Sequence, residues 1–157
     1  MTDRGAQVRA PRADDLPALA DLKIAWSAPE RTVSLSERTH FIASLARWMA
    51  DREDRLVCRV AEVDGTLVGM AWLVLDERVP NVDDAHRMTG DVQSVFVLAE
   101  HRGHGIGTML VRSLCEAADA VGARLSVRAN DASVPLYRSA GFVAAGALLE
   151  RRPGAAP

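Results

Sequence analysis

The sequence predicts an α/β (α+β) fold with a mixed, mostly antiparallel sheet of about six strands flanked by about four helices. Two observations carry this prediction. Apolar residues recur at helical spacing in three long segments. β-rich runs precede and follow these segments, and two of the β-rich runs are joined by Asp64-Gly65. The order is strand, two helices, three strands, helix, strand, helix and strand, which is typical of a sheet with helices packed on its faces.

The chain's length and composition suit one ordered domain. We expect that domain to span 1–157, with a core of about 6–150 and a flexible tail at 151–157. Hydrophobic residues make up 48% and charged residues 25%, and no apolar run approaches the roughly 18 residues of a membrane span. The net charge of -2 provides no broad basic field, so we expect neither nucleic acid nor a membrane as a partner.

The N-terminus has no apolar secretory core, and two cysteines are too few for a disulfide framework. We therefore expect a soluble, cytoplasmic protein. Arginine supplies nearly all the basic side chains and Lys23 is the sole lysine. Together with the abundant alanine, this indicates a GC-rich coding sequence, and we expect a bacterial source.

The N-terminal third predicts a short strand followed by two helices. The strand begins near Gln7, and Asp14 or Asp15 can cap the first helix, which has Pro17 in its first turn. A loop then leads to a second helix from about Ser36. The apolar faces of the two helices are formed by Leu16, Leu19, Leu22, Ile24 and Trp26, and by Phe41, Ile42, Leu45, Trp48 and Met49.

The middle of the chain predicts three strands. Residues 55–76 form a hairpin because Asp64-Gly65 is a pair that a type I′ turn favours. Residues 76–91 contain proline, asparagine and glycine among charges, so we predict a long loop there. The run at 91–98 is apolar on both faces, as a buried central strand would be.

The C-terminal third predicts helix, strand, helix and strand. The first helix runs from Gly105 to about Ala120, and Gly122 can end it in a left-handed cap. A short strand at 124–129 and a short helix at 133–140 follow. The run FVAAGALLE at 142–150 predicts a final strand.

Three glycines stand where the central strand gives way to the long helix, in HRGHGIGTML at 101–110. The N–H groups at such a helix start have no intrahelical partner and form an anion site, which Arg102 and His104 could reinforce. Glycines at 103, 105 and 107 would let a phosphate approach closely. A dinucleotide fingerprint is excluded because the spacing is Gly-x-Gly-x-Gly, and a Walker A loop because no lysine precedes Thr108.

The stretch VFVLAEHRGHGIGTML resembles the signature of the GNAT N-acetyltransferase superfamily, in which a strand runs into Arg/Gln-x-x-Gly-x-Gly/Ala at the head of a helix. Arg102, Gly105 and Gly107 stand at its fixed positions. NDASVPLYRSAGF resembles the family's second signature, matched by Asn130, Ser133, Leu136, Tyr137, Gly141 and Phe142. The resemblance covers the element order from near Gln7 to near Glu150, and Ala99 departs from it where many members have proline.

The resemblance implies that acetyl-CoA is the donor and that no metal is needed. Its pyrophosphate would lie on the N–H groups of 103–108, and its pantetheine arm beside Val95–Val97 like an added strand. The thioester would sit where this strand parts from 124–129, and a backbone N–H near Val97 could stabilise the oxyanion. The implied CoA contacts are Val95, Phe96, Val97, Arg102, Gly103, His104, Gly105, Ile106, Gly107, Thr108, Asn130, Ser133 and Tyr137.

The resemblance also implies direct attack by a primary amine, with Tyr137 as the general acid that protonates the departing thiolate. The usual position of the base falls on Gln93 or Ser94, neither of which is a useful base. Asp91 is the candidate base, although a strand-end carboxylate in solvent, a water relay or an amine that is already deprotonated fits as well. Trp26 and Gln93 are candidate acceptor-site residues, with core packing the alternative for Trp26.

Other candidate residues have ordinary explanations. His101 and His104 lack the second pair that a metal site would need. Cys58 and Cys115 read as partly buried thiols rather than nucleophiles. Trp48 and Trp72 are predicted to be core residues. The acidic residues of the predicted loop, which could attract a cationic amine, read as a solvated surface: Asp76, Glu77, Asp83 and Asp84.

We therefore expect an acetyl-CoA-dependent N-acetyltransferase acting on a small-molecule or peptide amine through a ternary complex. Transfer of another acyl group and an acyl-CoA sensor without turnover are the alternatives, and a purely structural protein would have no use for a phosphate cradle. The acceptor is not identified by the sequence. A homodimer is a habit of the family, and the sequence does not decide the oligomeric state.

Overall fold

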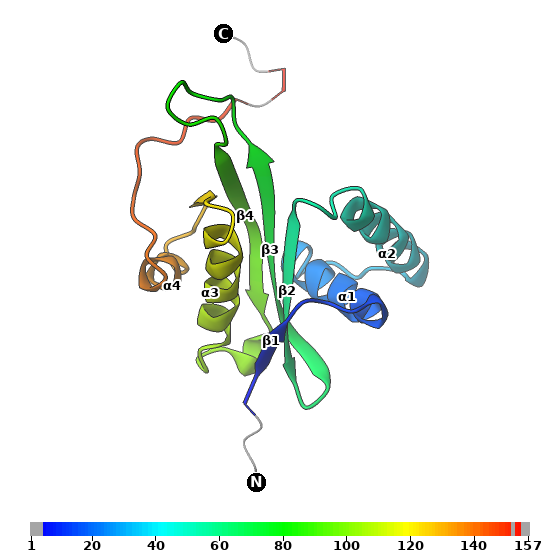
Figure 1. Ribbon diagram of the computed structural model, residues 1–157. Coiled ribbons are helices and arrows are strands. Elements are labelled where there is room, and N and C mark those ends of the chain that lie inside the picture. The colour runs from blue at the N-terminus through cyan, green and yellow to red at the C-terminus, as the bar shows by residue number, and fades with distance from the viewer. Residues whose placement is uncertain (1–4, 152, 155–157) are drawn as a thin grey trace.

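A five-stranded sheet runs through the centre of the computed structural model, which describes residues 5–151 and 153–154 (Figure 1). The strands lie in chain order: β1 (Gln7–Arg9), β2 (Leu56–Val63), β3 (Thr66–Glu77), β4 (Met88–Val97) and β5 (Arg124–Val127). The first four pair antiparallel and β5 pairs parallel with β4. The predicted mixed, mostly antiparallel sheet is confirmed, with one strand fewer than expected.

Helices cover both faces of the sheet (Figure 1). One face carries α1 (Leu16–Ser27) and α2 (Leu35–Ala50), and the other carries α3 (Ile106–Asp119) and α4 (Val134–Ser139). Two short 3-10 helices, η1 (Ala13–Asp15) and η2 (Ala99–His101), precede α1 and follow β4. In the described part of the chain, no helix combines the length and the apolar character needed to cross a bilayer.

Strand β3 is buried on both faces and supplies side chains to two separate cores. Met70 and Trp72 face α1 and α2, where they pack with Leu19. Ala71 and Leu73 face the opposite way, toward α3. This alternation follows from the period of two along a strand, and it explains why the run is apolar throughout.

The β2–β3 hairpin turns at Asp64-Gly65, as predicted. Both residues have positive φ, 47° and 79°, which is the backbone of a type I′ turn. Gly122 also has the positive φ expected of a cap beyond α3, and the N–H of Ala123 donates to the carbonyl of Ala118. These local predictions are confirmed because each depends on the backbone of a single residue or pair.

The start of α1 is held by an ion-pair cluster rather than by a side-chain cap. Asp15 occupies the N-cap position without capping the helix. Its carboxylate instead accepts from the N–H of Arg12 and pairs with Arg9, whose guanidinium also binds Glu62 at 2.5 Å. The hydrogen bonds from Arg9 hold the pKa of Asp15 at about 2. The cluster ties β1, β2 and the entry to α1 together.

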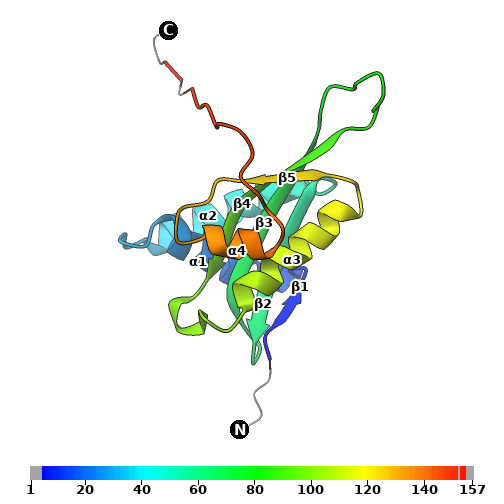
Figure 2. The same ribbon diagram turned by 90° about the vertical axis from the view of Figure 1, so that its left-hand side faces the viewer.

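The loop predicted at 76–91 is shorter than expected. Strand β3 runs to Glu77 and β4 begins at Met88, and these two residues pair across the hairpin. Only 78–87 lies outside the strands, as a projecting loop seen clearly in Figure 2. The prediction was wrong at both ends because cross-strand pairing overrides the weak strand propensity of the charged residues there.

The final strand predicted at 142–150 is absent. Gly146 has a φ of 64°, which interrupts an extended run. Val143, Leu148 and Leu149 are exposed, so the apolar residues of this segment do not face a core. Within this described segment only Phe142 packs against the core. Its ring meets that of Tyr137 edge to face, with the ring centroids 5.5 Å apart. The predicted flexible tail at 151–157 falls largely on 152 and 155–157, which lie outside the described residues.

A bulge in β4 decides which face its residues present. Val92 pairs with Leu73 and Ser94 pairs with Trp72, so Gln93 is an extra residue without a partner in β3. Without the bulge, Ser94 would share the α3 face with Val92. The bulge therefore turns Ser94 toward α1 and α2.

Gly90 is the point of closest approach between β4 and its neighbours. A Cβ at this position would lie 2.6 Å from Leu125 Cδ2 and 2.7 Å from Leu73 Cδ1. We expect Gly90→Ala to lower the free energy of unfolding by about 1–3 kcal/mol, as overpacking does in a dense core. Urea unfolding measures this change. Gly5→Ala, where no atom lies within 4 Å of the added Cβ, is the control. Equal stability of the two variants would contradict the close approach.

Candidate active site

A groove of about 550 Å³ lies at the end of β4, between the loop before α3 and the start of α4. Its lining contains most of the predicted CoA contacts, together with three residues that were not predicted, His101, Ala132 and Leu136. The predicted residues that line it are Val95, Phe96, Val97, Arg102, Gly103, Gly105, Ile106, Gly107, Thr108, Asn130 and Ser133.

The loop between η2 and α3 has the backbone of an anion cradle. Gly103 and Gly105 both have φ of 79°, a left-handed conformation that side chains rarely adopt. Gly105 is the N-cap residue of α3 and provides no side-chain oxygen, so the N–H groups of the first turn keep their hydrogen-bonding capacity. The residues of that turn, 106–108, line the groove. The positive end of the α3 dipole adds to the attraction for an anion.

Arg102 fastens this loop to β4. Its Nε donates to the carbonyl of Val97 at 2.8 Å, and its guanidinium lies 5.6 Å from the ring centroid of Phe96. His104 is exposed and does not line the groove, because its ring turns back toward the carbonyl of His101, 3.4 Å from Nδ1. His101 takes the place in the groove wall that the sequence suggested for His104.

The far wall of the groove is the entry to α4. Asn130 Oδ1 accepts from the N–H of Ser133 at 2.9 Å, and Ser133 Oγ donates to the carbonyl of Asn130 at 3.0 Å. This reciprocal pair fixes the turn before the helix. The two polar residues of the second signature thus shape the wall as well as lining it.

Part of β4 lacks a strand partner on the groove side. In the described structure β5 pairs only with Thr89–Val92, so the edge of β4 from Gln93 to Val97 is open toward β5. The N–H of Leu98 donates to the carbonyl of Val68 in β3. Because successive residues direct their peptide groups to opposite edges, those of Val97 point to the open edge. The parting of the two strands that the sequence analysis expected is confirmed.

Tyr137 lies behind this parting, in the core between α3, α4 and the sheet. It is largely buried and, unlike its neighbour Leu136, does not line the groove. It lines a separate pocket of about 370 Å³ with β5 and residues 142–145. Burial raises the pKa of the Tyr137 hydroxyl, so it stays protonated through neutral pH.

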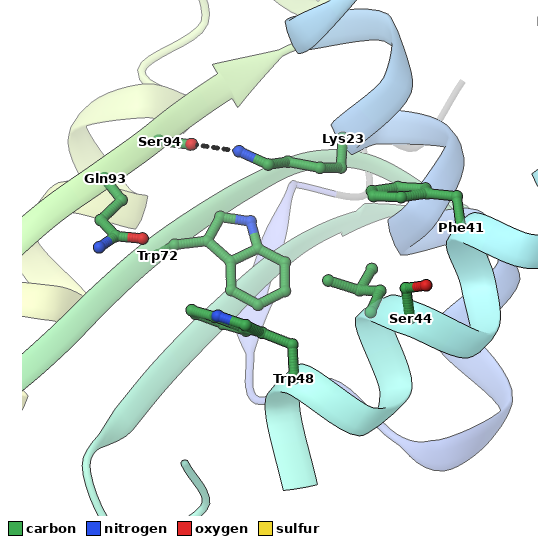
Figure 3. Close-up of a pocket in the computed structure, with 8 residues that line it drawn as sticks. Lys23, Phe41, Ser44, Trp48, Trp72, Gln93 and Ser94 are labelled. Carbon is green, nitrogen blue, oxygen red and sulfur yellow. Dashed lines mark hydrogen bonds between the residues drawn. The ribbon is translucent and has the colours of Figure 1, made fainter. Parts of the chain in front are cut away.

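A second pocket, of about 350 Å³, opens on the other face of the sheet between α1, α2 and β4 (Figure 3). Its lining continues directly into that of the groove along β4: Gln93 and Ser94 line the pocket, and the next residue, Val95, lines the groove. The rest of its lining comes from both helices and from β3: Lys23, Phe41, Ser44, Leu45, Trp48 and Trp72.

Two of the three tryptophans form one wall of this pocket. Trp48 and Trp72 meet edge to face, with ring centroids 6.1 Å apart. Both were predicted to be core residues, and Trp72 is buried, yet each also lines the pocket. Trp26 does not line it. Its ring lies beneath Lys23, whose Nζ is 3.9 Å from the ring centroid.

Lys23 is the charged residue of the pocket, and the sequence analysis did not place it there. Its Nζ donates to Ser94 Oγ at 2.6 Å, across the pocket from α1 to β4 (Figure 3). Burial lowers the pKa of its ammonium group. The one available signal was that a chain rich in arginine keeps a single lysine. A GC-rich coding sequence explains the single lysine equally well.

Asp91 lines neither the groove nor the pocket between α1, α2 and β4. It is an exposed residue of β4 that pairs with Val74 on the face of the sheet shared with Trp72. The acidic residues of the β3–β4 hairpin also lie away from the pocket lining, and Asp76 pairs with Arg55 at 3.1 Å. The pocket lining therefore contains no carboxylate.

The thiols do not behave as nucleophiles. Burial raises the pKa of Cys58 to about 12 and also raises that of Cys115, so both stay protonated near neutral pH. Within the described residues, no three His, Cys, Asp or Glu side chains gather closely enough to hold a metal ion.

A glycine-lined helix start beside a parted pair of parallel strands is the arrangement that the acetyltransferase signatures led us to expect. The sequence model of the acetyltransferase (GNAT) family matches residues 20–142. The chain belongs to the GNAT acetyltransferase family, and the resemblance found in its two signatures is confirmed.

A curated relative matches half of the chain. The glucosamine 6-phosphate N-acetyltransferase of Trypanosoma brucei brucei is 31% identical over 79 residues, 50% of this chain and 52% of that protein. The chain thus matches about half the length of this curated relative.

Solved structures share the fold across nearly the whole chain. A glucosamine-6-phosphate N-acetyltransferase from Arabidopsis thaliana superposes with a TM-score of 0.76 at 14% identity, covering 96% of this chain and 99% of that one. A "predicted acetyltransferase with acetyl-CoA" from Clostridium acetobutylicum gives 0.73 at 17% identity, covering 94% and 96%.

Gly107 tests the groove without disturbing the fold. Its added Cβ would lie 3.6 Å from Leu136 Cδ2, an ordinary contact, on a helical backbone. We expect Gly107→Ala to keep or slightly raise the stability, by up to about 1 kcal/mol. We expect the same change to weaken CoA binding about tenfold, because the methyl group enters the groove. Calorimetry and thermal unfolding measure the two effects.

Gly122→Ala is the matched control, because it strains a residue with φ of 65° outside the groove. It should lower the stability by about 1–2 kcal/mol and leave CoA affinity unchanged. If Gly107→Ala bound CoA as tightly as the original chain, the groove would not be the CoA site.

Proposed function

We propose that this chain transfers an acetyl group from acetyl-CoA to a primary amine by direct attack within a ternary complex. The observation that carries the proposal is the order of features along β4: the pocket is lined by Ser94, the groove begins at the next residue, Val95, and the open strand edge leads from there toward the glycine cradle. A donor with phosphate groups at one end and a thioester at the other would place its phosphates on the cradle and its thioester next to the pocket.

The donor would bind by two kinds of backbone interaction. The pyrophosphate of acetyl-CoA would accept hydrogen bonds from the N–H groups at the start of α3, at the positive end of the helix dipole. The amide groups of the pantetheine arm would pair with the open edge of β4, as an added strand does. The Asn130 turn and Arg102 would hold the two walls of the groove in place.

The reaction joins the amine nitrogen to the acetyl carbon as the bond from carbon to sulfur breaks. The N–H of Val97, on the open edge, would donate to the oxyanion of the tetrahedral intermediate. The departing thiolate takes a proton from Tyr137 and leaves as the thiol of CoA. Burial raises the pKa of Tyr137, so the hydroxyl holds its proton at neutral pH and is a weaker acid than a free tyrosine.

The amine must lose a proton before or during attack. Asp91 is the proposed acceptor of that proton, reached through water because its carboxylate lies in solvent beyond the pocket. An amine that enters already deprotonated would need no base. No side chain of the pocket lining offers a carboxylate for direct transfer.

The names of two similar proteins suggest one candidate acceptor amine. Two of the similar proteins are named for glucosamine 6-phosphate, although one matches half of this chain and the other shares 14% identity. Glucosamine 6-phosphate therefore belongs in the panel of amines, beside amino acids, peptide N-termini and polyamines.

Calorimetry with acetyl-CoA and CoA, followed by a thiol-release assay over this amine panel, tests the function. We expect binding of both nucleotides and acetyl-dependent release of CoA with at least one amine. Longer acyl-CoA donors in the same assay measure the acyl preference. Binding without release over the whole panel would favour an acyl-CoA sensor, and the absence of binding would overturn the proposal.

Tyr137→Phe tests the proton donor. Removing the hydroxyl should lower kcat by about a hundredfold, since general acid catalysis contributes on that order, with acetyl-CoA affinity changed much less. Steady-state kinetics and calorimetry measure both quantities. Phe142→Leu disturbs the ring packing around Tyr137 without removing a donor, and it should lower kcat much less. An unchanged rate in Tyr137→Phe would exclude this hydroxyl as the acid.

A further inference from the structure

The pocket between α1, α2 and β4 has a composition that selects among amines. Aromatic and aliphatic side chains form most of its walls, with three rings, from Phe41, Trp48 and Trp72. Three of its four polar side chains, Lys23, Gln93 and Ser94, lie where α1 meets β4, and the fourth, Ser44, lies on α2 (Figure 3). A small ligand with a ring at one end and polar groups at the other matches this division.

Lys23 places a positive charge in that apolar setting without a counter-ion. No Asp or Glu in the part of the chain that the structure describes forms an ion pair with it. Its partners are the hydroxyl of Ser94 and the ring of Trp26. A half-buried ammonium group with only neutral partners is destabilised, and burial lowers its pKa accordingly. An anionic ligand group would supply the missing charge.

The position of Lys23 also limits the distance between the ligand's anion and its amine. Lys23 Nζ lies 2.6 Å from Ser94 Oγ, and the next residue, Val95, lines the donor groove. An anion held by Lys23 is therefore close to the site proposed for the thioester. An amine on the carbon atom that bears the anion would be close to that site too, while a ring on the same carbon could reach the aromatic wall.

We propose that the acceptor is an aromatic α-amino acid, with its carboxylate on Lys23, its amine at β4 and its ring among Phe41, Trp48 and Trp72. This inference rests on the proposed function. The α-amine gains the acetyl group as an amide, the thioester bond breaks, and CoA leaves as the thiol. Polycationic acceptors are disfavoured, because the pocket lining contains one cation and no carboxylate.

The test compares acceptors that differ by one group. L-phenylalanine has the ring and the carboxylate, 2-phenylethylamine lacks the carboxylate, and L-alanine lacks the ring. Glucosamine 6-phosphate supplies an amine and an anion on a sugar ring, without an aromatic ring. We expect kcat/KM for L-phenylalanine to exceed that of each other amine by about tenfold or more, the effect of a charge-assisted hydrogen bond or of a buried ring.

Lys23→Met isolates the charge. We expect the preference for L-phenylalanine over 2-phenylethylamine to fall to near unity in Lys23→Met and to persist in Lys23→Arg, which keeps a cation. Arg47→Met removes an exposed charge from α2 outside the pocket and should keep the preference. Acetyl-CoA affinity, measured by calorimetry, checks that each variant is folded.

Tryptophan fluorescence measures the pocket independently of turnover, because the three tryptophans of the chain either line the pocket or contact Lys23. L-phenylalanine should change the emission of the original chain at concentrations about tenfold lower than 2-phenylethylamine, a difference that Lys23→Met abolishes.

The outcomes separate the two proposals. Loss of acetyl-CoA binding would overturn the proposed function. If the enzyme acetylated 2-phenylethylamine or glucosamine 6-phosphate with the same kcat/KM as L-phenylalanine, this inference alone would be overturned. An unchanged emission with L-phenylalanine would overturn it as well.

Discussion

The parting of β4 from β5 after Val92 is the constraint on which the rest of the site depends. The N–H and C=O groups of a strand in the interior of a sheet form hydrogen bonds with its two neighbours. Here the last residues of β4 keep one neighbour, β3, and present their other edge to a groove. The carbonyl of Val97 on this edge accepts from Arg102, and a ligand with amide groups of its own would satisfy the peptide groups that have no strand partner.

The bulge at Gln93 extends that constraint to the second face of the sheet. Because the extra residue reverses the alternation, Ser94 turns toward α1 and α2 while Val95 lines the groove on the other side. Consecutive residues of one strand therefore line two different cavities. A bulge beside a reaction site is a common way to aim a side chain, and here it aims the hydroxyl that receives Lys23.

Membership of the GNAT family and the geometry of the two cavities bear on different parts of the chemistry. The family match over residues 20–142 spans both signatures, which contain the glycine cradle and Tyr137. The pocket proposed for the acceptor is lined mainly by α2 and β4, with one residue each from α1 and β3, and contains no residue of the two signatures. Its ammonium group contacts a hydroxyl and a ring rather than a carboxylate, so the pocket has a positive charge at the end next to β4.

The sequence by itself determined the features whose cause is local. The left-handed glycines before α3, the positive φ angles of Asp64-Gly65 and the helical faces follow from backbone sterics and side-chain spacing over a few residues. Tertiary structure alone decided the rest. The missing strand at 142–150, the longer β3–β4 hairpin and the placing of Lys23 against Ser94 depend on which distant segments meet. Pairing and burial between such segments carry more free energy than local propensity, so no local pattern could have disclosed them.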